Sequence, residues 1–421
     1  MNIAVIGGGR VGLPTAAALA ILGHRVACCE RDRFRRQTAA AGRAPFADSG
    51  LEKALVAAIQ SGALRFCEGV AATVKNAEAA LVAVPVSDGN AGRNELKKVA
   101  AAIAAARCSV LAVKSTVPPG TCEQLQKTYD ICVAANPEFL RQGRGFEDCM
   151  SPSRIVVGAD DRRARRTLRE VYAPLINRGI TYIETSRAAA EIAKLASNMF
   201  LASRTALINE IADLCEAAGG DIKDAARILA ADRRIGGGYL RAGPGFGGPC
   251  LPKDGRLLAE AGSAAGIAMP AVKAVYDSNR RRLRCLAGRV AELSPPNPVV
   301  AVWGAAFKPG ADSVCDSPAV EIMRLLDARG CRLRVCEPLA DAAALQNALP
   351  AATYFCDGIA ALSGADTLVT ANKHESFSRI SPAAVSRAMK GDLVFDYAGI
   401  FDRDACRRAG ISLHAIGAPS A

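Results

Sequence analysis

A cysteine set in a glycine-rich segment is the residue of this chain best placed to do chemistry. Cys250 directly follows Gly-Phe-Gly-Gly-Pro at residues 245–249, and Asp254 follows it at helical i+4 spacing. Glycines let backbone N–H groups approach a ligand where a Cβ would block them. Cys250 is thereby presented as a nucleophile, and the carboxylate of Asp254 can reach the same space. The competing roles are a small buried cysteine and an acid that stabilises a helix N-terminus through the helix dipole.

A second motif, Gly-Gly-Gly-Arg-Val-Gly at residues 7–12, follows the first apolar, strand-like run of the chain. Between a strand and a helix, this spacing is typical of a dinucleotide-binding turn. Gly7 makes the tight turn, Gly9 lets the backbone approach a pyrophosphate, and Gly12 lets the helix pack on the sheet. Together with a nucleophilic Cys250, this turn predicts oxidation of an alcohol past the aldehyde, through a covalent thioester.

The acid at the end of the second apolar run, Glu30, indicates which dinucleotide is bound. Its carboxylate would accept hydrogen bonds from the adenosine ribose, which favours NAD over NADP. Arg31 and Arg35 follow closely, and a guanidinium there could instead hold the 2′-phosphate of NADP. NAD is the predicted cofactor.

Short apolar runs that alternate with alanine-rich helical stretches predict the fold class. The runs lie at residues 3–6, 25–29, 80–84, 110–114, 131–135, 154–157, 180–183, 299–304, 332–336, 367–370 and 393–395. Such alternation is typical of parallel, doubly wound sheets. The Pro-rich segment at residues 294–298 is the clearest linker. We predict an α/β protein in which two Rossmann-like lobes are joined by a helical central domain, with boundaries at 1–187, 188–294 and 295–421.

Helical periodicity is strongest between the two predicted lobes. Residues 191–218 read as one helix that ends at a glycine pair, and residues 254–292 as one or two long helices. Earlier helices are predicted over 51–60 and 96–106. The central helices are the natural surface for a homodimer.

Composition limits the compartment and the partners. The chain has 421 residues, a formal net charge of +12 and 15 cysteines. Cysteines that are scattered, without CxxC pairs or a His-rich cluster, indicate a reducing cytoplasm and no metal site. We expect no signal peptide and no membrane span. Arginine runs without interleaved aromatics do not indicate nucleic-acid binding, so the charge is either solvated surface or a cleft for anionic ligands.

Ordered motifs along nearly the whole chain resemble those of the nucleotide-sugar 6-dehydrogenases, the UDP-glucose and GDP-mannose dehydrogenase family. These motifs lie at residues 7–14, 84–85, 115–121, 136–141, 191–198, 245–254 and 307–309. The resemblance implies oxidation of the C6 alcohol of a nucleotide sugar to a carboxylate, with two NAD and no metal.

The resemblance also implies catalytic roles. Cys250 resembles the nucleophile that forms a thiohemiacetal and then a thioester, and Asp254 resembles the acid that holds the hydrolytic water. Lys194 resembles the lysine that stabilises developing oxyanions, with Asn198 as its partner one helical turn on. An ion pair between Lys194 and Glu191 on the same helix face is the competing role.

Further roles follow from the same resemblance. Glu138 resembles the general base for thioester hydrolysis, and Thr116 the hydroxyl that orients the water. The implied cofactor-binding residues are Gly7, Gly9, Arg10, Val11, Gly12, Glu30, Arg35, Val84, Pro85, Ser115 and Thr116. The implied substrate-binding residues are Glu138, Phe139, Leu140, Lys194, Asn198, Arg234, Tyr239, Gly247 and Lys308. Arg234 resembles an arginine that the neighbouring subunit inserts into the sugar site, which implies a homodimer; a plain surface charge is its alternative.

Three residues depart from the family pattern. Gln142 stands where the family usually has a second glutamate, and an amide cannot take a proton as a carboxylate does. Cys315 stands where the family usually places an arginine that helps to hold NAD. Ala398 falls where UDP-glucose enzymes often have an arginine, and residues 396–401 resemble the GDP-mannose form.

UDP-glucose is the leading predicted substrate, and GDP-mannose is the alternative. The three departures also suggest a different class, a protein that binds nucleotide sugars with weakened catalysis. A two-electron hydroxyacid dehydrogenase would explain the first lobe but gives Cys250 no role. The NADH released per sugar separates this last hypothesis from the four-electron reaction.

Overall fold

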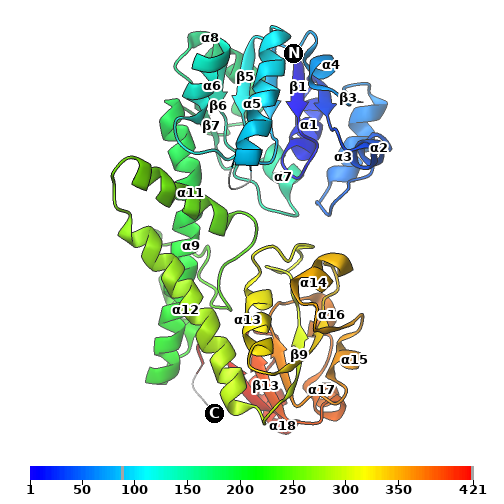
Figure 1. The fold of residues 1–421 in the computed structure, drawn as a ribbon, viewed down its shortest axis with the longest axis vertical. Coiled ribbons are helices and arrows are strands. Elements are labelled where there is room, and N and C mark those ends of the chain that lie inside the picture. The colour runs from blue at the N-terminus through cyan, green and yellow to red at the C-terminus, as the bar shows by residue number, and fades with distance from the viewer. Residues whose placement is uncertain (87–89, 419–421) are drawn as a thin grey trace. The chain divides into compact units, whose positions relative to one another are not determined.

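Two β-sheets, one in each half of the chain, organise the protein (Figure 1). The structure is a computed structural model that describes residues 1–86 and 90–418. It contains two compact units, residues 1–197 and 198–421. The predicted fold class, two doubly wound α/β lobes with a helical region between them in the sequence, is confirmed.

The sheet of the first unit has the strand order β3-β2-β1-β4-β5-β6-β7-β8. Its strands are β1 (Asn2–Ile6), β2 (Arg25–Cys29), β3 (Leu64–Cys67), β4 (Ala79–Val82), β5 (Val110–Val113), β6 (Cys132–Ala135), β7 (Ile155–Gly158) and β8 (Tyr182–Thr185). All neighbours pair in parallel except β6 and β7. The order reverses between β1 and β4, and ligands of open α/β sheets bind at the carboxyl ends of strands beside such a reversal.

Helices cover both faces of this sheet. They are α1 (Gly12–Ile21), α2 (Arg33–Ala40), α3 (Leu51–Gln60), α4 (Val70–Val74), α5 (Asn90–Ala105), α6 (Thr121–Tyr129), α7 (Gly145–Met150) and α8 (Arg162–Ile176). The apolar sides of α1, α3 and α8 pack into one core, and those of α4, α5 and α6 into the other. Because consecutive strand residues face opposite sides, Ala112 belongs to the first core and Val113 to the second.

The second unit repeats this plan in its last part. Its sheet has the order β11-β10-β9-β12-β13-β14. The strands are β9 (Val299–Trp303), β10 (Arg332–Cys336), β11 (Thr353–Phe355), β12 (Thr367–Thr370), β13 (Leu393–Asp396) and β14 (Ser412–Ala415). The helices are α13 (Pro318–Asp327), α14 (Ala342–Ala348), α15 (Gly358–Leu362), α16 (Glu375–Ser378), α17 (Pro382–Ala388) and α18 (Arg403–Arg408). The order of β9 to β14 matches that of β1 to β6, so the two lobes share one topology.

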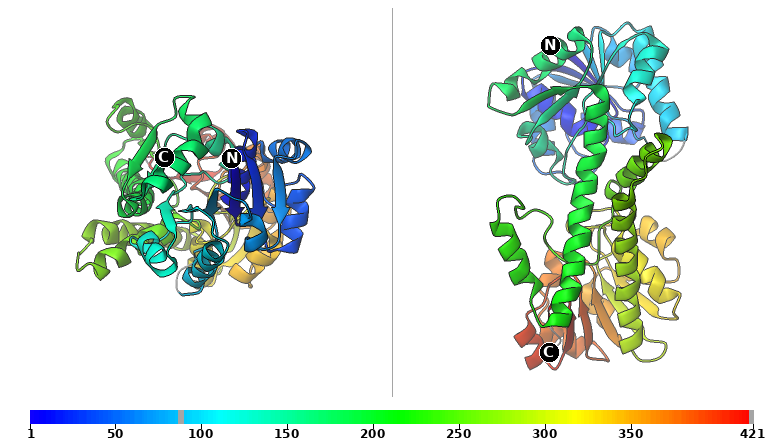
Figure 2. Two further views of the ribbon diagram at one scale, coloured as in Figure 1. Left: turned by 90° about the horizontal axis from the view of Figure 1, so that it is seen from above. Right: turned by 90° about the vertical axis from the view of Figure 1, so that its left-hand side faces the viewer.

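Four helices lie between the lobes in the sequence: α9 (Arg187–Ala218), α10 (Ile222–Ala231), α11 (Leu251–Ala264) and α12 (Pro270–Leu293). Figure 2 shows α9 as one uninterrupted helix. The predicted helical stretch at residues 254–292 is two helices, since Gly266 adopts a left-handed conformation and Pro270 starts the next helix. The two compact units divide inside α9, so the three-domain division at residues 187 and 294 stays a prediction.

The buried carboxylate of Glu191 ties the first turns of α9 to the start of α6. Its Oε2 accepts a hydrogen bond from the Gly120 N–H at 2.6 Å, and its Oε1 accepts one from the Cys122 N–H at 2.8 Å. The first N–H groups of a helix have no partners within the helix, so Glu191 acts as the cap of α6. Burial raises the pKa of the Glu191 carboxyl, while these two bonds favour its charged form. The loop before α6 carries Thr116, so the cap also anchors a predicted site residue.

The Glu191→Gln variant tests this anchor. Its amide retains one acceptor oxygen and turns an NH₂ group toward a backbone N–H, so we expect the free energy of unfolding to fall by about 1–3 kcal/mol. Urea denaturation measures this change, and hydrogen exchange at Gly120 and Cys122 should become faster. Glu123→Gln, on the exposed side of α6, is the control and should change stability by less than about 0.5 kcal/mol. Unchanged exchange at both amides would contradict the capping role.

Candidate active site

The turn between β1 and α1 has the shape that a dinucleotide needs. Gly7 has a φ of +104°, and a Cβ at Gly12 would lie 1.7 Å from the Gly7 carbonyl oxygen. Both positions therefore require glycine. At Gly9, by contrast, no atom lies within 4 Å of the Cβ position, so this glycine faces open space. Arg10 and Val11 complete the turn, and the Arg10 guanidinium lies 5.1 Å from the centre of a phenylalanine ring.

The predicted ribose acid, Glu30, lies at the end of β2 beside this turn. Its Oε2 accepts a hydrogen bond from the Gly8 N–H at 3.2 Å, and its Oε1 accepts one from the Asp32 N–H at 2.9 Å. Arg36, which the sequence reasoning did not single out, donates to the Glu30 carbonyl oxygen at 2.7 Å. Arg35 lies on the exposed side of α2. Arg36 thus braces the backbone of Glu30, and the cofactor role of Arg35 stays a prediction.

The other predicted cofactor residues gather at the carboxyl ends of β4 and β5. The Ser115 hydroxyl donates to the Val84 carbonyl oxygen at 2.7 Å and joins the two strand ends. A Cβ at Gly7 would lie 2.5 Å from the carbonyl oxygen of the residue before Val84, so the glycine turn adjoins the same edge. Pro85 and the half-buried Thr116 follow these residues directly. The described residues therefore fit a dinucleotide at the strand-order reversal.

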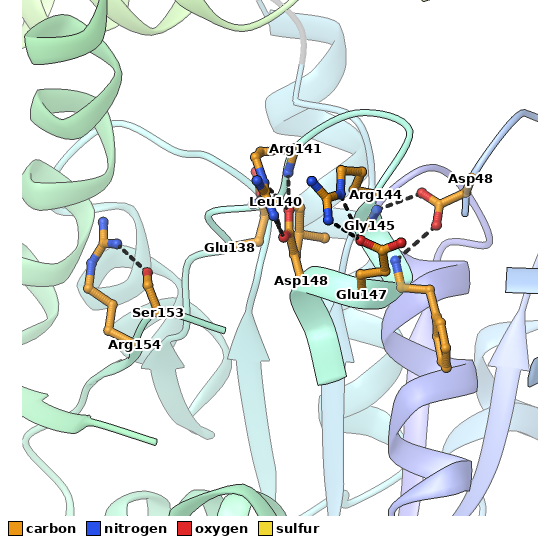
Figure 3. A network of polar contacts seen from close by, with 11 residues as sticks. Asp48, Glu138, Leu140, Arg141, Arg144, Gly145, Glu147, Asp148, Ser153 and Arg154 are labelled. Carbon is orange, nitrogen blue, oxygen red and sulfur yellow. Dashed lines mark hydrogen bonds and ion pairs between the residues drawn. The ribbon is translucent and has the colours of Figure 1, made fainter. Parts of the chain in front are cut away.

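A buried ion pair lies at the carboxyl end of β6. The Nζ atom of Lys194, on α9, is 3.2 Å from Oε1 of Glu138, and both side chains are almost fully buried. The other oxygen of Glu138 accepts the N–H of Leu140 at 2.6 Å, as Figure 3 shows. Lys194 also lies 5.5 Å from the centre of the Phe139 ring. The alternative pair with Glu191 does not form, because Glu191 caps α6 instead.

The loop after β6 is braced by contacts that the sequence did not reveal (Figure 3). Arg141 binds Asp148 through its side chain and through its backbone N–H, at 2.7 Å for the latter. Asp48 accepts the N–H groups of Gly145 and Phe146 at the start of α7, at 2.7 and 2.9 Å. These acids follow no recognisable spacing from Glu138, so only the fold brings them together.

The glycines before Cys250 are required by the packing of the chain on itself. A Cβ at Gly247 would lie 2.1 Å from the Asp316 carbonyl oxygen, and one at Gly248 would lie 2.4 Å from the Phe307 ring. Gly245 has a φ of +142°, a conformation that side chains rarely adopt. The sequence reasoning located this turn correctly but explained its glycines by ligand approach. Packing against the segment after β9 accounts for them as well.

Cys250 immediately precedes α11 and is exposed to solvent. Its carbonyl oxygen accepts the Asp254 N–H at 2.8 Å, which is the first turn of the helix. The Asp254 carboxylate is buried and accepts hydrogen bonds from Asn198 Nδ2 at 2.5 Å and from Lys253 Nζ at 2.7 Å. Asp254 is therefore held in place by two donors. Asn198 was predicted as a partner of Lys194, and Lys253 was not predicted.

The remaining predicted substrate residues also lie in the second unit. Arg234 is bound to Asp232 at 2.6 Å, and 89% of its side chain is exposed. Tyr239 is exposed and has a φ of +61°. The Lys308 ammonium lies 5.7 Å from the centre of the Phe307 ring, whose edge packs on Gly248. Lys308 and the Cys250 turn are thus linked through Phe307.

The three departures have distinct surroundings. Gln142 is half-buried in the loop after β6. Cys315 lines a groove of about 950 Å³ in the second unit together with Arg256, and burial raises the pKa of its thiol, so it brings no charge at neutral pH. The carbonyl oxygen of Ala398 accepts a hydrogen bond from Arg241 at 2.6 Å. An arginine thus reaches this position from elsewhere in the chain.

Disulfides, clusters of metal ligands and helices that could span a membrane are absent from the described residues. All fifteen cysteines lie within the described residues, and none of these cysteines forms a disulfide. Within residues 1–86 and 90–418, no group of three or more His, Cys, Asp or Glu side chains is arranged to hold a metal ion. In the same part of the chain, no helix has the length and apolar character that crossing a membrane requires.

Three features together indicate a dinucleotide-dependent oxidoreductase. They are the dinucleotide turn at a strand-order reversal, the buried lysine–glutamate pair and the exposed thiol. Comparison with known proteins agrees. The chain belongs to the UDP-glucose/GDP-mannose dehydrogenase family, whose NAD binding domain matches residues 1–176, whose central domain matches 188–281 and whose UDP binding domain matches 301–403. The predicted resemblance and the predicted cofactor, NAD, are both confirmed.

Individual relatives match over nearly their full length. The UDP-glucose 6-dehydrogenase of Rickettsia felis is 34% identical over 433 residues, which cover 99% of this chain and 96% of the relative. That of Pseudomonas aeruginosa is 33% identical and covers 100% of this chain and 98% of the relative. The solved structure of a UDP-glucose dehydrogenase from Pyrobaculum islandicum is 32% identical, with a TM-score of 0.87 over 99% of this chain and 98% of that one.

The packing of Gly247 gives a test of the turn that carries Cys250. We expect Gly247→Ala to lower the free energy of unfolding by about 1–3 kcal/mol, because the new Cβ has no room. It should also change the rate at which iodoacetamide modifies Cys250. Gly243→Ala is the matched control, since its Cβ would lie 4.0 Å from the nearest carbonyl oxygen. Equal melting temperatures and equal alkylation rates for both variants would show that the turn tolerates a side chain.

Proposed function

We propose that this chain oxidises the C6 alcohol of UDP-glucose to the carboxylate of UDP-glucuronate, a four-electron reaction that consumes two NAD. The exposed thiol of Cys250 at the start of α11 carries the proposal, since a two-electron dehydrogenase has no use for it. The relatives named UDP-glucose 6-dehydrogenase support the choice of sugar.

Each residue has a task in the proposed reaction. NAD, held by residues 7–12 and Glu30, supplies the two-electron acceptor for each oxidation. The Cys250 sulfur adds to the C6 aldehyde as a thiohemiacetal, and the second oxidation converts this adduct to a thioester. Water then attacks the thioester carbonyl, which releases the carboxylate and returns the thiol of Cys250. Covalent capture also keeps the reactive aldehyde from escaping.

In the proposed reaction, side chains stabilise the negative charge of the oxyanion and accept the proton of the attacking water. Lys194 offers an ammonium to the developing oxyanion, and Glu138, which it contacts at 3.2 Å, takes the proton of the attacking water. Asp254, held by Asn198 and Lys253, and Thr116 orient that water. Gln142 cannot serve as a second base, so Glu138 acts alone.

GDP-mannose is the alternative substrate, and residues 396–401 are the reason to keep it. Ala398 there is buried, and its backbone binds Arg241 rather than projecting a side chain toward a nucleotide. The substrate roles of Phe139, Leu140, Arg234, Tyr239, Gly247 and Lys308 belong to this same proposal. A comparison of kcat/KM for the two sugars decides between them.

We further propose that the chain acts as a homodimer through α9. Phe200, Leu207 and Leu214 are 74%, 59% and 65% exposed and follow one another at intervals of seven residues. On a helix this spacing places the three side chains on one side, where they form an exposed apolar stripe of the kind that marks a protein–protein interface. Arg234 would then reach the sugar site of the partner. A cytoplasmic location fits the fifteen cysteine thiols, which a reducing compartment preserves.

Stoichiometry tests the proposed reaction. We expect two NADH per mole of limiting UDP-glucose, and one NADH would indicate a two-electron enzyme. Cys250→Ala should lower the rate of UDP-glucuronate formation by at least about a thousandfold, because the covalent route is lost. Cys285→Ala, another exposed cysteine, is the control and should retain full activity. Full conversion by Cys250→Ala would refute the thioester mechanism.

The apolar stripe on α9 is tested by sedimentation. Leu207→Glu places a charge in the proposed interface, so we expect the mass in solution to fall from that of two chains to that of one. Leu339→Glu, at a residue 45% exposed in the last lobe, should leave the mass unchanged. A wild-type protein that sediments as a single chain would rule out the dimer.

A further inference from the structure

The first unit contains a cavity whose wall includes Glu138, Phe139 and Leu140 and extends well beyond these residues of the proposed reaction. It has a volume of about 430 Å³ and lies between α1 and α8, under the segment that follows β6. Of the predicted catalytic residues, only Glu138 belongs to its wall; Lys194, Thr116 and the Gly7–Gly12 turn do not. The cavity thus lies behind the turn that carries Glu138, apart from the residues assigned to NAD.

A buried cation forms part of this wall. Lys114 directly follows β5 and is only 7% exposed. Its Nζ atom is 3.4 Å from Oδ1 of Asn136, which is long for a hydrogen bond. The same oxygen already accepts the hydroxyl of Tyr172 at 2.5 Å. Among residues 1–86 and 90–418, no carboxylate pairs with Lys114. A buried ammonium that lacks a counter-charge is costly, so this position favours an anion.

The acids in the wall do not supply that charge, because other groups neutralise them. Glu138 is paired with Lys194, and Asp148 with Arg141. Burial raises the pKa of the Cys149 thiol to about 11, so this group is neutral at physiological pH. The wall therefore retains a net positive charge.

A second cation strengthens this imbalance. Arg154 lies in the wall with its guanidinium 3.7 Å from the centre of the Phe139 ring. Its guanidinium donates hydrogen bonds to the hydroxyls of Ser153 and Ser197, at 3.0 and 3.4 Å, and Figure 3 shows the first of them. Both partners are uncharged, so Arg154 adds a positive charge that no acid in the wall offsets.

Much of the remaining wall is apolar. Leu19 and Leu22 of α1, Leu175 of α8 and the Phe139 ring contribute to it. A pocket of this size, with much apolar lining and a few placed charges, is typical of sites for small organic ligands. We propose that this cavity binds a small organic anion, with a carboxylate or phosphate at Lys114 and a compact apolar body against α1 and α8. The Lys114 end of the cavity is not lined by the residues assigned to NAD, and the cavity adjoins the nucleotide-sugar site at Glu138, Phe139 and Leu140.

Benzoate is the probe for this site, and benzamide is its neutral counterpart of the same shape. Saturation-transfer NMR and calorimetry with the full chain should show benzoate bound more tightly than benzamide. Lys114→Met keeps the aliphatic stem and removes the charge, so the benzoate Kd should rise about tenfold or more. Lys127→Met, at an exposed lysine of α6, should leave the Kd unchanged.

A second variant keeps the proposal testable if Lys114→Met does not fold. Ala18→Leu reduces the cavity from α1 without altering charge, and it should weaken both probes while circular dichroism stays that of the wild type. Saturating NAD and UDP-glucose should not displace benzoate. Three results would each overturn the proposal. They are displacement of benzoate by NAD or UDP-glucose, equal affinity for benzoate and benzamide, and no binding of benzoate at a concentration 10-fold above the expected Kd of about 1 mM. Since no turnover is measured, the result does not depend on the proposed reaction.

Discussion

The buried pair of Lys194 and Glu138 is the interaction on which the arrangement of the first unit's site depends. Removing two charges from water is costly, and the cost is offset only when geometry and further hydrogen bonds satisfy both groups. Here the pair closes at 3.2 Å, and the Leu140 N–H takes the second carboxylate oxygen. Glu138 comes from the end of a strand and Lys194 from α9, so the pair fixes the long helix to the sheet edge. Glu191, three residues earlier on α9, makes a second attachment at α6. One helix face thereby sets the position of both the lysine and the loop of Thr116.

Glycine imposes the matching constraint on the turn that presents Cys250. Gly247 and Gly248 are pressed against Asp316 and Phe307, so the turn has one conformation available to it. Such a packed turn explains how an exposed thiol can be held in a fixed place. A nucleophile needs orientation as well as access, and the packing of this turn would supply orientation in the role proposed for Cys250.

The sequence predicts the central strands and the edge strand β8, but three other edge strands were missed. β2 and β10 have the bounds expected. β3, β11 and β14 were missed, and each is a short strand at the edge of its sheet. An edge strand is half-exposed, so its sequence resembles a loop. Candidate site residues that belong to a motif can be proposed from the sequence, whereas partners brought together only by the fold, such as Asp48 and the start of α7, carry no local signal.

The two lobes share one topology but use their first turn differently. In both, an acid at the end of the second strand accepts N–H groups from the turn after the first strand. From the first turn, Glu30 accepts the Gly8 N–H, and open space remains at Gly9. Glu337 takes the N–H groups of two successive residues, Ala305 and Ala306, at 2.7 and 2.8 Å. A carboxylate that already occupies two donors leaves less for a pyrophosphate, so the second turn is closed where the first is open. This difference agrees with an NAD binding domain in the first lobe and a UDP binding domain in the last, built on the same strand order.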